Sequence, residues 1–88
     1  MPNIYKVENP VYQSDAEIWE QYRENLIVVT NIERDGSYFS RFVGGIVRYY
    51  GDDRKKLINM WGDLNDSDEY GECQFKTLMM DREVHVHG

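Results

Sequence analysis

Apolar residues first recur at helical spacing near the N-terminus. Ile18, Trp19 and Tyr22 lie on one side of a segment whose other side is charged, which is the pattern of an amphipathic helix. Residues 14–17, Ser-Asp-Ala-Glu, have the form of a capping box, in which the serine and the glutamate satisfy each other's backbone N–H groups. The pattern predicts a helix over residues 15–24, ended by the asparagine that follows.

A second helical pattern lies in the second half of the chain. Its apolar face follows the spacing i, i+3, i+4 and i+7 and consists of Leu57, Met60, Trp61 and Leu64. Just before it, Gly51 is suited to a turn, and Asp52 or Asp53 can accept hydrogen bonds from the first backbone N–H groups of the helix. The sequence therefore predicts that the two aspartates begin this helix.

The segments between the helices have the composition of β-strands. Residues 26–32 are rich in β-branched side chains, and Asp35-Gly36 is a strong signal for a two-residue hairpin turn. The second strand is expected to run to Tyr50, with a bulge or a close backbone approach at Gly44-Gly45. A two-residue turn predicts the cross-strand pairs Ile32–Phe39, Thr30–Arg41, Val29–Phe42 and Val28–Val43.

The remaining segments predict the edges of the sheet. Residues 73–80 alternate as a last strand, and residues 81–88 form a tail or an edge strand. Residues 1–13 contain both prolines and predict an extended N-terminal arm that lies over the core or pairs at a sheet edge. The fold class expected is α+β, in one domain over residues 1–88: a small antiparallel sheet, built from the hairpin and the C-terminal strand, packed against two helices.

Composition narrows the classes of partner. The chain has 88 residues and a net charge of −6, which disfavours phosphate-neutralising nucleic-acid binders and proteins of anionic membrane surfaces. The single cysteine excludes an internal disulfide and fits the cytoplasm. We expect no signal peptide, because no apolar run follows a basic N-terminus, and no apolar stretch is long enough to span a bilayer.

Candidate chemistry is sparse. Residues 50–53, Tyr-Gly-Asp-Asp, look like the metal-binding turn of RNA-dependent polymerases. A polymerase palm, however, needs a larger sheet and a second acidic motif on a neighbouring strand, and 88 residues cannot supply both. His85 and His87 share one face of the C-terminal segment, and Cys73 is the other soft ligand, so these three residues are the candidates for a metal site. The acidic stretch 65–72 predicts a surface loop.

Residues 25–80 resemble small prokaryotic domains of unknown function. The resemblance rests on the sequence from Trp19 to Tyr22, the strand Leu26 to Val29, Ile46-Val47, the Gly-Asp of residues 50–53 and the helix from Leu57 to Leu64. It implies a small α+β domain and supplies no catalytic residues.

Three hypotheses about function follow. No nucleophile stands beside an acid–base pair, whereas seven Tyr and two Trp are present, and such residues anchor protein interfaces. The first hypothesis is therefore a non-enzymatic interaction or regulatory domain without a cofactor, which binds a protein partner or associates with itself. The alternatives are a phage-type or host-defence inhibitor that mimics the charge of nucleic acid, and a protein that binds metal through its C-terminal histidines.

Overall fold

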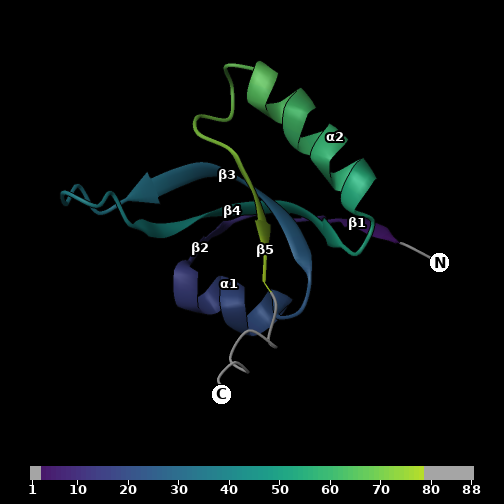
Figure 1. The fold of residues 1–88 in the computed structure, drawn as a ribbon, viewed down its shortest axis with the longest axis horizontal. Coiled ribbons are helices and arrows are strands. Elements are labelled where there is room, and N and C mark those ends of the chain that lie inside the picture. The colour runs from purple at the N-terminus through teal and green to yellow at the C-terminus, as the bar shows by residue number, and fades with distance from the viewer. Residues whose placement is uncertain (1–2, 79–88) are drawn as a thin grey trace.

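The computed structural model describes residues 3–78, which form an α+β fold with an antiparallel sheet (Figure 1). The elements are β1 (Ile4–Lys6), β2 (Tyr12–Ser14), α1 (Asp15–Tyr22), β3 (Leu26–Arg34), β4 (Phe42–Gly51), α2 (Arg54–Asp66) and β5 (Gln74–Thr77). The strand order is β1-β4-β3-β5, and β2 also pairs with β4. The expected fold class is confirmed.

The two helices cover opposite faces of the sheet, as Figure 1 shows. Ile27 and Val29 pack with α1, whereas Leu26 and Val28 pack with α2. Alternate residues of β3 point to opposite faces, and both faces are covered. This explains why residues 26–29 form an unbroken apolar run.

The N-terminal arm pairs at a sheet edge, one of the two arrangements expected for it. β1 pairs with the end of β4 through Ile4 and Gly51, and β2 pairs with its first half through Tyr12 and Ile46. Between the two strands, residues 7–11 leave the ladder after Val7 donates to the Arg48 carbonyl. One discontinuous strand therefore borders β4.

The predicted hairpin register is wrong. Val28 pairs with Tyr49 instead of Val43, and Val29 pairs with Val47 instead of Phe42. The strands are joined by a loop over residues 35–41, because Asp35 accepts hydrogen bonds from the backbone N–H groups of Ser37 and Arg41 and thereby stabilises a wider turn.

The other two predicted pairs fail for the same reason. Thr30 pairs with Ile46 rather than Arg41, and the expected partner of Ile32, Phe39, lies in the loop. Phe42, the predicted partner of Val29, pairs with Arg34.

Bulges interrupt the pairing of β3 with β4. Arg48 is an extra residue between Val47 and Tyr49, whose partners Val29 and Val28 are adjacent. As a result, Val47 packs on the α1 face and Tyr49 on the α2 face. A second register shift follows Thr30, where β3 contains the extra residue.

The close backbone approach expected at the two glycines is present. A Cβ on Gly45 would lie 2.7 Å from Val29 Cγ2, and one on Gly44 would lie 2.5 Å from the Gln13 carbonyl oxygen. Only glycine leaves room for the neighbouring strands at these positions.

The helix ends follow the predicted chemistry. The capping box of Ser14 and Glu17 forms at α1, although α1 ends at Tyr22, before the predicted end, and Glu24 takes a positive φ of 68°. Asp53 caps α2, because its side chain accepts from the Lys56 N–H at 3.1 Å. Within residues 3–78, no helix is long and apolar enough to cross a membrane.

Candidate interaction surface

Two adjacent aromatic side chains project from the end of the β3–β4 hairpin. Tyr38 is 95% exposed and Phe39 is 78% exposed. Their ring centroids lie 5.3 Å apart at an interplanar angle of 82°, the edge-to-face geometry that aromatic pairs favour. Figure 1 shows this end of the hairpin extending beyond both helices. We call Tyr38 and Phe39 the aromatic tip.

Asp35 organises the backbone that carries the aromatic tip. Its Oδ1 accepts from the Ser37 N–H at 2.9 Å and from the Arg41 N–H at 3.2 Å. The hydrogen bonds from the Ser37 backbone and side chain are the main cause of a lowered pKa for the Asp35 carboxyl. The ionised carboxylate thus ties the two ends of the loop together at neutral pH.

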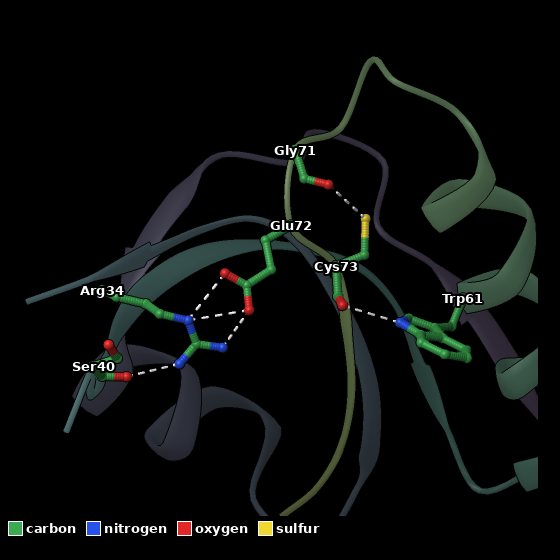
Figure 2. A network of polar contacts seen from close by, with 6 residues as sticks. All are labelled: Arg34, Ser40, Trp61, Gly71, Glu72 and Cys73. Carbon is green, nitrogen blue, oxygen red and sulfur yellow. Dashed lines mark hydrogen bonds and ion pairs between the residues drawn. The ribbon is translucent and has the colours of Figure 1, made fainter. Parts of the chain in front are cut away.

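Arg34 fixes the base of the loop to the segment that precedes β5 (Figure 2). Its Nε donates to both carboxylate oxygens of Glu72, at 3.0 and 3.1 Å, and its Nη1 donates to the Ser40 carbonyl at 2.8 Å. Its Nη2 makes the ion pair with Glu72. The hydrogen bonds between the two side chains raise the pKa of Arg34 and lower that of Glu72.

The other contacts in Figure 2 hold the start of β5 against α2. Trp61 Nε1 donates to the Cys73 carbonyl at 3.1 Å, and the Cys73 thiol lies 3.6 Å from the Gly71 carbonyl. Cys73 is 6% exposed, and burial raises the pKa of its thiol. A buried, protonated thiol of this kind packs rather than reacts. A continuous connection therefore runs from the hairpin loop through Arg34 and Glu72 to Cys73, whose carbonyl accepts from Trp61 of α2.

The residues predicted as metal candidates are not brought together by the part of the chain that the structure describes. His85 and His87 lie outside residues 3–78, as do residues 81–88 as a whole. Within 3–78, no group of three or more His, Cys, Asp or Glu side chains is placed to hold a metal ion. A metal role for the C-terminal histidines stays a prediction.

The two aspartates of residues 50–53 have separate structural contacts. Asp53 caps α2, and Asp52 accepts a hydrogen bond from the Asn3 backbone N–H through its Oδ1. Both aspartate N–H groups donate to the Asn3 carbonyl. The pair thus joins the start of α2 to the N-terminal arm.

The acidic stretch 65–72, predicted as a surface loop, begins in the last turn of α2 and continues beyond it. Asp63 and Asp66 of this helix are exposed. The first turn of the same helix has exposed side chains of the opposite sign, Arg54, Lys55 and Lys56. Both signs of charge therefore lie on one helix, and mimicry of nucleic acid stays a prediction.

Sequence reasoning missed the aromatic tip. A two-residue turn placed Phe39 inside the ladder, opposite Ile32. The available signal was the composition of residues 37–40, Ser-Tyr-Phe-Ser, in which two aromatics stand between small polar residues that are typical of loops.

A scan against protein-family models gave no match for this chain. Searches of curated proteins and of solved structures also returned no match. The resemblance to small prokaryotic domains therefore stays a prediction.

Proposed function

We propose that this chain is a non-enzymatic protein-interaction domain that binds a protein partner through the aromatic tip. The observation that carries the proposal is the exposure of Tyr38 and Phe39, 95% and 78%, on a loop that is held in place at its base. Single exposed apolar side chains are common on protein surfaces. Two adjacent aromatic rings on a fixed projection are the kind of group that fills a pocket in a partner.

Preorganisation favours binding at this position. Arg34 and Asp35 restrain the loop through contacts to Glu72 and to the loop backbone. A restrained loop loses less conformational entropy when it binds. Each ring can also remove a large apolar area from water, because aromatic side chains bury roughly 150–250 Å² when fully covered.

Photocrosslinking tests whether the aromatic tip touches a partner. The photoreactive amino acid p-benzoyl-phenylalanine replaces Tyr38 in the chain expressed in its own host. The matched control carries the same amino acid in place of Asn59, an exposed position on α2. We expect irradiation to join a discrete protein at the Tyr38 position and not at the Asn59 position.

The captured protein is then purified and its affinity for the wild-type chain is measured by calorimetry. The double substitution Tyr38→Ser, Phe39→Ser is expected to weaken binding by about 2 kcal/mol or more, or roughly thirtyfold. The control Ile58→Ser removes an exposed apolar residue from α2 and should leave the affinity unchanged. Equal affinity of the double variant and the wild type would refute the proposal.

A further inference from the structure

A cleft on the α2 face of the sheet lies apart from the aromatic tip. Its volume is about 340 Å³, within the range of roughly 300–1,000 Å³ that is typical of small-molecule sites. Its walls come from the N-terminal arm, the bulge of β4, the end of α2 and the loop that follows. The lining residues are Lys6, Val7, Glu8, Pro10, Arg48, Tyr49, Leu64 and Tyr70.

Arg48 is held in this cleft by neutral groups. Its Nε donates to the Thr30 hydroxyl at 2.9 Å, and its Nη2 donates to Asn31 Oδ1 at 3.3 Å. Thr30 is fully buried and donates in turn to Asn31 Oδ1 at 2.7 Å. The guanidinium carbon lies 5.0 Å from the centroid of the Tyr70 ring, a cation–π contact. These contacts fix the orientation of the guanidinium before any ligand arrives.

No carboxylate neutralises this guanidinium within residues 3–78. The ion pair among these residues joins Arg34 to Glu72. The hydrogen bonds of Arg48 come from Nε and Nη2, and its Nη1 donates to no side chain or carbonyl among residues 3–78. Lys6 and Arg48 supply two positive charges to the lining, and Glu8 supplies one negative charge. The cleft therefore has one net positive charge in a chain whose total charge is −6.

The bulge sets the direction of the Arg48 side chain. Arg48 is the extra residue of β4, and a β-bulge redirects a side chain that a regular strand would align with its neighbours. A purely structural contact to Thr30 and Asn31 requires only donors, which a neutral side chain could provide. The cation–π contact with Tyr70 uses this charge in part, but no carboxylate within residues 3–78 forms an ion pair with it.

We propose that the cleft binds a small organic carboxylate with an apolar body. One net positive charge matches a monoanion, and Arg48 can donate to carboxylate oxygens through Nη1. Pro10 and Leu64 offer an apolar wall to the rest of the ligand. A phosphate dianion would leave one negative charge uncompensated and is disfavoured on the same ground.

Titration of the full chain by NMR tests this proposal with phenylacetate as the probe. Phenylacetamide is the neutral match, and phenyl phosphate is the dianion. We expect saturable shifts at the resonances of Arg48, Leu64 and Tyr70 with phenylacetate, and a dissociation constant on the order of 1 mM, as suits so small a ligand. The affinity for phenylacetamide and for phenyl phosphate should be lower than that for phenylacetate by about tenfold or more.

Two pairs of variants locate the binding. Arg48→Gln should weaken phenylacetate binding about tenfold or more, whereas Arg23→Gln, which removes an exposed arginine after α1, should not. Lys6→Glu reverses the charge of the cleft without touching the Thr30 network, and Lys55→Glu makes the same change on an exposed turn of α2. The Lys6 pair decides the question if Arg48→Gln does not fold.

Three results would overturn the inference: no saturable shift with phenylacetate, equal binding of the amide, or an equal loss in Lys6→Glu and Lys55→Glu. None of these outcomes depends on the aromatic tip. Binding in the cleft and binding of a protein partner can therefore fail separately.

Discussion

Gly51 occupies a position at which the structure leaves no room for a side chain. Its φ is +147°, and a Cβ built there would lie 2.2 Å from the Asn3 carbonyl oxygen and 3.0 Å from Ile4 Cα. The positive φ costs a residue with a side chain roughly 1–3 kcal/mol. Steric overlap with a packed backbone adds about 1–3 kcal/mol.

We therefore expect Gly51→Ala to lower the free energy of unfolding by about 2–6 kcal/mol. A domain of this size has a total stability of roughly 4–13 kcal/mol, so the change removes a large part of it. The chain can reduce the strain only by moving Asn3, whose carbonyl accepts from the N–H groups of Asp52 and Asp53. Amide exchange in β1 should then rise more than exchange in β3.

The assay is equilibrium unfolding in urea, followed by circular dichroism, with Gly62→Ala as the matched control. Gly62 lies inside α2, and a Cβ built there meets nothing within 4 Å. Because alanine is the better helix former, this control should stabilise the protein by about 0.5–1 kcal/mol. The reasoning is refuted if Gly51→Ala unfolds within about 0.5 kcal/mol of the wild type, the usual range of surface substitutions.

Three further predictions concern the ends of the hairpin and the start of α2. Asp53→Ala should lower the free energy of unfolding in urea by about 1 kcal/mol, and Asp53→Asn should change it little. Because we assign this aspartate to capping, Mg²⁺ should not raise the melting temperature of the wild type or of either variant. The native pKa of Glu72 is lowered by Arg34, so the pair adds stability above the unfolded pKa of a glutamate and loses it as the pH falls through the lowered native value. A carboxyl NMR titration should show that pKa rising in Arg34→Gln, and an unchanged value would count against the contact. Sedimentation velocity at high micromolar concentration should show self-association of the wild type through the hairpin or a sheet edge, and a monomer would exclude it.

The parts of the fold that sequence reasoning could predict are those fixed by neighbouring residues. The capping box of Ser14 and Glu17 needs only a spacing of three, and the cap at Asp53 needs only the N–H groups of the next turn. The apolar face of α2 likewise follows from its period. These local signals agree with the structure to within a few residues at each end.

The hairpin register could not be predicted in the same way, because it depends on distant partners. Asp35-Gly36 favours a tight turn when taken alone, yet Arg34 finds Glu72, thirty-eight positions later, and holds the wider loop in place. The exposure of Tyr38 and Phe39 follows from the wider loop, which the local hydrogen bonds of Asp35 and this long-range contact stabilise together. The composition of residues 37–40 indicates a loop, but the spacing of the strands alone places Phe39 inside the ladder.

The bulges in β3 and β4 made the register hard to predict, and they also build the cleft around Arg48. A strict two-residue period places Val47 and Tyr49 on one face, whereas the extra residue Arg48 sends them to opposite faces of the sheet. The register shift after Thr30 brings a buried hydroxyl and the Asn31 amide to the same guanidinium. A regular ladder would have been easier to predict and would have lacked this oriented charge. The departure from the regular pattern is thus what fixes the position of a positive charge in the cleft.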